Sequence, residues 1–185
     1  DFFDDFSVDL SKWTAQHYDG SGSASIVSGW ARVDSEASGD FWGTSDGGSG
    51  LFHASPLSDK YAFEAKLREQ SYPTSEGYNR FLMLRETLDP NSRFYAMLFD
   101  GDSSHITTVW RDSTGGSAGW AGDNTGWARG ANTVFRVRLI KIGTTFYAQV
   151  SPDGITWYDV GSRSGAYHGY LGLVDSQHDG YTEFD

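Results

Sequence analysis

Apolar and polar residues alternate along several segments of the chain, as they do in a β-strand that buries one face. The segment Lys60–Gln70 and the segment Val134–Ile140 both show this pattern. In the first, one face collects Tyr61, Phe63, Ala65 and Leu67, while the other is mainly charged. No window repeats apolar residues at the three- and four-residue spacing of an amphipathic helix. The pattern therefore predicts an all-β protein.

Two further segments, Arg80–Glu86 and Arg93–Asp100, are apolar on both faces. A strand of this kind belongs in the middle of a sheet, where something covers or binds its second face. Two interpretations follow. Either the outer face of the central sheet forms a mixed polar and aromatic groove for a ligand, or loops or a neighbouring subunit cover it.

Turn-forming residues separate the predicted strands. The clearest turn is Ser151–Gly154, between the strand-like segments Thr144–Val150 and Ile155–Val160, and it predicts a tight hairpin. About a dozen short strands at this spacing are typical of a β-sandwich. No linker or change of composition divides the chain, so residues 1–185 are interpreted as a single domain.

Composition narrows the function classes. The chain has no Cys, which excludes zinc–thiolate and iron–sulfur sites. Its formal net charge of −11 repels phosphate backbones, so nucleic acid is not an expected partner. No stretch of 18 apolar residues occurs, so no membrane insertion by a spanning helix is expected.

Three segments resemble the concanavalin A-like lectin/glucanase superfamily, in particular its laminin-G-like domains. They are the opening Phe2–Phe6 with Leu10–Trp13, the hairpin Tyr147–Trp157, and the closing Tyr170–Leu173 with Phe184-Asp185. The resemblance implies a jelly-roll sandwich of two curved antiparallel sheets. Chains of this family run on past the Phe-Asp pair, so the domain is expected to be part of a longer chain.

The same superfamily contains hydrolases and lyases, but their catalytic patterns do not stand out. Its glucanases carry Glu-x-Asp-x-x-Glu on one strand, whereas Glu-x-Asp occurs here only at Glu183–Asp185. The five His residues lack metal-ligand spacing. An enzyme, either a glycan-active hydrolase or a lyase, therefore remains the minority interpretation.

Sugar recognition needs aromatic faces and planar polar groups, and one loop offers both. Trp110 ends a predicted strand, and the Gly/Ser-rich segment after it carries Trp120, Asn124 and Trp127. Each Trp either packs back on the body or meets a ligand. The full set of candidate ligand contacts is Trp110, Trp120, Trp127, Arg85, Asp100, Asn124, Tyr95 and His105.

Calcium is considered at two places. Asp100–Ser104 begins like an EF-hand loop but lacks the glycine and the final glutamate, so a plain turn is the better interpretation. The resemblance also implies a structural calcium ion where the termini meet, with Asp185 and either Asp4 or Asp5 as ligands. No cofactor is required for the expected function.

We therefore predict a non-catalytic carbohydrate-binding or adhesion module, extracellular or surface-exposed, whose partner is a polysaccharide or other glycan. The alternative from another class is a structural or decoration module of a virion, surface layer or filament, with neighbouring subunits as partners. An open groove favours the first interpretation, and an aromatic patch covered by a neighbour favours the second.

Overall fold

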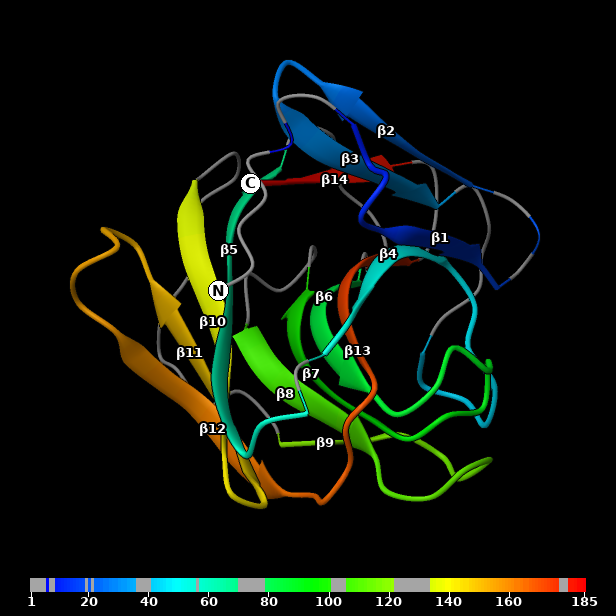
Figure 1. Ribbon diagram of the computed structural model, residues 1–185, viewed down its shortest axis with the longest axis vertical. Coiled ribbons are helices and arrows are strands. Elements are labelled where there is room, and N and C mark those ends of the chain that lie inside the picture. The colour runs from blue at the N-terminus through cyan, green and yellow to red at the C-terminus, as the bar shows by residue number, and fades with distance from the viewer. Residues whose placement is uncertain are drawn as a thin grey trace.

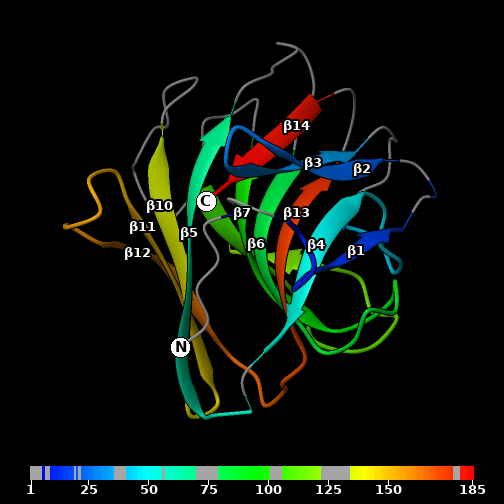
Figure 2. The same ribbon diagram turned by 45° about the horizontal axis from the view of Figure 1, so that its top comes forward.

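The computed structural model describes residues 6, 9–18, 20, 22–35, 41–55, 57–69, 79–100, 106–121, 134–176 and 180–185. These residues form fourteen β-strands in two seven-stranded sheets, in which every strand pairing is antiparallel. The predicted all-β sandwich is confirmed (Figures 1 and 2). In the part of the chain that the structure describes, no helix is long and apolar enough to cross a membrane.

In the first sheet, sheet A, one strand from near the end of the chain lies between two strands from its first half. From edge to edge it runs β1 (Thr14–His17), β4 (Ser49–Ala54), β13 (Tyr170–Ser176), β6 (Asn79–Arg85), β7 (Phe94–Asp100), β8 (Ile106–Arg111) and β9 (Gly119–Trp120). Because its central strands come from distant parts of the sequence, the sheet forms only when the chain crosses repeatedly between layers.

Sheet B lies opposite and curls over the top of the sandwich in Figure 1. Its order is β12 (Tyr158–Ser164), β11 (Thr145–Ser151), β10 (Phe135–Ile142), β5 (Lys60–Glu69), β14 (Gly180–Phe184), β3 (Trp30–Ser35) and β2 (Ser23–Val27). The alternation predicted for the segments that form β5 and β10 is confirmed. Phe63, Leu67 and Val137 lie in the core, whereas Glu64 and Arg136 do not.

Strands β6 and β7 are buried on both faces, as their sequences predict. Leu82 and Met97 belong to the core between the sheets, whereas Phe81 and Leu98 belong to a second apolar cluster on the outer face of sheet A. That second cluster means that part of the outer face of sheet A is itself covered.

The predicted hairpin joins β11 to β12. Gly154 has a φ of 73°, the left-handed conformation that glycine adopts without strain. Asp153 Oδ1 accepts hydrogen bonds from the backbone N–H groups of Ile155 and Thr156 at 2.8 and 2.7 Å. These bonds lower the pKa of Asp153 to about 2. They keep residues 155–157 in the turn, so the returning strand begins at Tyr158 and not at Ile155.

Polar side chains line one end of the gap between the sheets. Ser49 lies directly opposite both His17 and Asp175 in neighbouring strands, and Asp175 lies opposite Arg80. The buried Asp175 carboxylate accepts a hydrogen bond from Thr182 Oγ1 of sheet B at 2.7 Å. This contact links the two sheets.

Burial raises the pKa of Asp175 to about 7, although Arg80 and the hydrogen bond from Thr182 oppose the shift. The folded protein therefore holds this proton over a pH range in which the unfolded chain has lost it. The stabilisation that results is complete below about pH 4 and is lost as the pH rises through about 7.

The change that tests this titration is Asp175→Asn. We expect the free energy of unfolding of the unchanged protein, minus that of the variant, to fall between about pH 4.5 and pH 7.5. The slope should not exceed about 1.4 kcal/mol per pH unit, the limit for one titrating group. Urea denaturation at a series of pH values measures it, and a difference that stays constant with pH would contradict the assignment.

Candidate functional site

A segment of the chain covers the outer face of sheet A. Phe41 is fully buried there, with its ring 5.1 Å from the ring of Phe81 and 6.2 Å from that of Phe94. Tyr18 packs edge-on against the same Phe41 ring at 6.0 Å. Of the two interpretations of the two-sided strands, the described residues therefore match coverage by the chain's own loop over this part of the sheet.

A buried ion-pair triad holds this covering loop in place. Asp46 accepts one hydrogen bond from Arg85 Nη2 and one from Arg111 Nη1, both at 2.7 Å. All three side chains have an exposed fraction of 0%. Burial raises the pKa of Asp46, whereas the two guanidinium groups lower it.

Several other guanidinium N–H groups of the triad bind backbone carbonyls of the surrounding loops. Arg85 donates to Thr87 O at 2.7 Å and to Asp89 O at 2.6 Å. Arg111 donates to Gly43 O at 2.7 Å and to Ser92 O at 3.1 Å. Two loops distant in sequence, 41–48 and 86–93, are therefore fixed by the same pair of buried cations.

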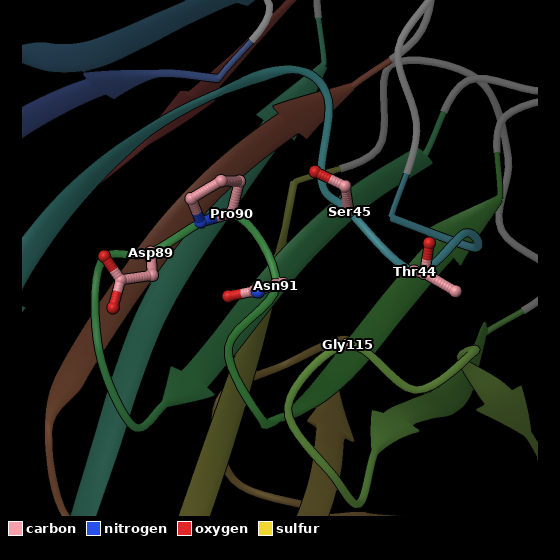
Figure 3. Close-up of a pocket in the computed structure, with 6 residues that line it drawn as sticks. All are labelled: Thr44, Ser45, Asp89, Pro90, Asn91 and Gly115. Atoms are coloured by element: carbon pink, nitrogen blue, oxygen red, sulfur yellow. The ribbon is translucent and has the colours of Figure 1, made fainter.

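A shallow pocket of about 620 Å³ lies above the triad. Figure 3 shows its walls coming from three loops, with Thr44 and Ser45 in the first, Asp89, Pro90 and Asn91 in the second, and Gly115 in the third. The third loop is joined to the second by a hydrogen bond from Gly115 N to Asn91 O at 2.8 Å. Residues with hydroxyl, amide and carboxylate side chains therefore line the same pocket.

An exposed indole adjoins the same loops. Trp120 has an exposed fraction of 56%, and its ring lies edge-on against Trp42 with the ring centroids 6.3 Å apart. Ala118 N donates to Trp42 O at 3.2 Å, which connects the loop before β9 to the covering loop. Trp42 is two residues from Thr44, so one member of the Trp pair belongs to the loop that forms one wall of the pocket.

Trp110 lies on the opposite face of sheet A from Trp120. Trp120 is directly opposite Val109, a member of the outer cluster, so its side chain points outward. Trp110 points between the sheets, is half-buried, and is covered by the guanidinium of Arg163 at 4.0 Å from the ring centroid. Its ring occupies the space that a side chain at Gly119 would fill. The candidate contacts Trp110 and Trp120 therefore cannot stack on one ligand from the same face of sheet A, and of the two only Trp120 has more than half of its surface exposed.

Burial also removes two predicted polar contacts. Tyr95 is 1% exposed and stacks on Phe146 of sheet B, 5.8 Å away, so its ring belongs to the core between the sheets. The guanidinium group of Arg85 donates its hydrogen bonds to Asp46 and to backbone carbonyls of the loops. Both residues support the structure and do not face a ligand.

The other sequence-predicted residues are placed as follows. Asp100 ends β7, and its side chain is not described. Trp127, Asn124, His105 and Asp5 lie outside the described residues.

Asp185 exchanges backbone hydrogen bonds with Lys66 at 2.6 and 2.8 Å, and its carboxylate lies 3.2 Å from Lys66 Nζ. Glu183, the other carboxylate of the Glu-x-Asp stretch, is buried between Arg32 and Arg68. Both carboxylates are thus used in ion pairs. Within the described ranges, no three His, Asp or Glu side chains gather in a way that could hold a metal ion. The calcium site at Asp5 and Asp185 stays a prediction.

Sequence reasoning missed Trp42 and the polar residues beside it. The available signal was the segment Phe41–Gly50, in which two aromatic residues precede a run rich in Gly and Ser. The argument that singled out Trp120 applies equally to Trp42. Asp89 and Asn91 carry no comparable signal, because they look like ordinary turn residues around Pro90.

Comparison with known proteins gives similar folds. No protein-family model matches the sequence, and no curated protein matches it. A functionally unknown protein from Saccharomyces cerevisiae is 20% identical, with 96% of this chain and 94% of that one aligned and a TM-score of 0.63. The GH43 BlXynB protein from Bacillus licheniformis has a TM-score of 0.73 at 14% identity, and covers 98% of this chain.

This chain spans only 37% of the length of BlXynB. The CBM2 module of the evolved Dit of Lactobacillus casei BL23 phage J-1 is 11% identical with a TM-score of 0.59, covering 97% of this chain and 92% of that one. At these identities the similarity shows the β-sandwich fold alone.

The triad yields a stability prediction. Asp46→Asn leaves two buried guanidinium groups without their carboxylate, so we expect the free energy of unfolding to fall by about 3–5 kcal/mol. The matched control is Asp112→Asn. Asp112 is 60% exposed and pairs with Arg163, so its loss should cost at most about 1 kcal/mol. Urea denaturation of both variants measures the difference, and equal costs would refute the structural role of the triad.

Proposed function

We propose that this chain is a non-catalytic carbohydrate-binding module that acts outside the cell, and that a glycan lies against Trp120 and enters the adjoining pocket. The observation that carries the proposal is the exposed indole of Trp120 beside a pocket of hydroxyl, amide and carboxylate groups. An indole face suits the apolar side of a pyranose ring, and the polar groups suit its hydroxyls.

The support beneath the site favours binding. Trp42 holds one edge of Trp120, and the buried triad fixes the loops that carry Thr44, Ser45, Asp89 and Asn91. A site whose parts are already ordered loses little conformational entropy when a ligand binds. Because sugar hydroxyls exchange water for protein partners with small net gain, each site is expected to bind weakly, and repeated sites would raise the avidity.

The fold supports the same class of ligand. GH43 proteins and CBM2 modules, which share the sandwich, are carbohydrate-related. The non-catalytic part of the proposal is supported by the carboxylates of the site. Of the six described residues that line the pocket, Asp89 alone carries a carboxylate, whereas glycoside hydrolysis commonly uses a pair.

The test is Trp120→Ala, measured by affinity electrophoresis against a panel of soluble polysaccharides. We expect at least one polysaccharide to retard the unchanged protein, and the variant to bind it at least about tenfold more weakly, the loss typical of a central aromatic contact. The control is Tyr147→Ala, which removes an exposed aromatic ring from sheet B. Equal binding by all three proteins would place the glycan elsewhere.

A second candidate function, an assembly module, is favoured by the outer face of sheet B. Ile142 and Tyr147 lie on that face in the neighbouring strands β10 and β11, with exposed fractions of 50% and 37%. If neighbouring subunits cover this face, the chain should self-associate in solution, and Tyr147→Ala should weaken that association while Trp120→Ala leaves it unchanged. Analytical ultracentrifugation separates the two candidates.

A further inference from the structure

The charge of the pocket bears on which class of glycan it takes, an inference that rests on the proposed function. Five of the six described lining residues are uncharged, and the sixth is Asp89, whose side chain is exposed. Thr44 and Ser45 carry hydroxyls and Asn91 an amide, groups that both donate and accept hydrogen bonds. A carboxylate only accepts, so Asp89 suits the O–H donors of a sugar.

One oxygen of Asp89 is held in place within its own loop. Thr87 Oγ1 donates to Asp89 Oδ2 at 3.0 Å, and the backbone N–H of Asp89 donates back to Thr87 Oγ1 at 3.2 Å. The interactions of the described residues include no donor to Oδ1. Asp89 is therefore oriented by Thr87 and keeps one carboxylate oxygen for a ligand.

The two cations of the triad lie beneath the pocket loops, where they are paired and sealed from solvent. Arg85 and Arg111 are fully buried and donate to Asp46 and to loop carbonyls. Arg111 Nε has no acceptor, but it too is sealed from solvent. Arg93 is a partly exposed cation at the end of the loop 86–93. It forms an ion pair with Glu86 through two hydrogen bonds.

A negatively charged ligand would thus meet Asp89 without a free cation among the described pocket residues. The formal net charge of −11 adds a repulsive field at long range. We propose that the pocket beside Trp120 binds an uncharged, hydroxyl-rich sugar residue, with Asp89 accepting hydrogen bonds from its hydroxyls, and that it discriminates against uronate-bearing and sulfated glycans.

The experiment compares neutral polysaccharides, namely a soluble β-glucan, a xylan and a galactomannan, with two polyuronates, polygalacturonate and alginate. Affinity electrophoresis at neutral pH and low salt is used with the unchanged protein, Asp89→Asn and Asp112→Asn. The two variants lower the negative charge equally, but only the first alters the pocket. Thermal denaturation verifies that both variants are folded.

We expect a neutral polysaccharide to bind, Asp89→Asn to weaken that binding about tenfold through loss of a charge-assisted hydrogen bond, and Asp112→Asn to leave it unchanged. Binding of a polyuronate that Trp120→Ala abolishes would overturn this inference and leave the proposed function standing. Neutral binding that Asp89→Asn does not weaken would also overturn it. Failure of every polysaccharide to bind would overturn the proposed function itself.

Discussion

A carboxylate held between two guanidinium groups, out of contact with water, is the interaction on which this end of the molecule depends. Asp46 lies in the loop 41–48, and its partners Arg85 and Arg111 end two strands of sheet A. Once these charges are desolvated, separating them is costly, so the loop is held against the sheet. The same guanidinium groups bind the carbonyls of the loop 86–93, and the pocket is therefore built on charges that a ligand does not touch.

The loop 41–48 covers part of the outer face of sheet A and so changes which part of that face is accessible. The rings of Phe41, Phe81 and Phe94 turn part of its outer face into a second core. A wide groove across this part of the sheet is thus replaced by a smaller site at its rim, where Trp42 and Trp120 meet the polar loops. Because these loops are tied to one another, the rim can be both exposed and ordered, and an ordered site loses little conformational entropy when a ligand binds.

Alternate positions along a strand face opposite sides of the sheet, and this alternation decides which aromatic residues reach solvent. Trp110 and Trp120 are neighbours across β8 and β9, but they lie on opposite faces of the sheet. Trp110 fills the edge of the sandwich under Arg163, and Trp120 stands outside on Trp42. A shift of the strand register by one residue would exchange these roles, because successive side chains of a strand alternate between the two faces of the sheet.

The sequence by itself determined the class of fold, because alternation of apolar residues, two-sided central strands and the Asp153-Gly154 turn are local patterns that any β-sandwich must satisfy. It also singled out Trp120 as one of three candidate Trp residues, without deciding whether that indole packs or is exposed. Only the tertiary structure decided that Arg85 and Tyr95 are buried, that Trp42 is the partner of Trp120, and that Asp89 and Asn91 join Thr44 at one pocket. Those outcomes depend on the register and on long-range closure of loops. Both are fixed by which surfaces meet in space and leave no signature in the neighbouring residues.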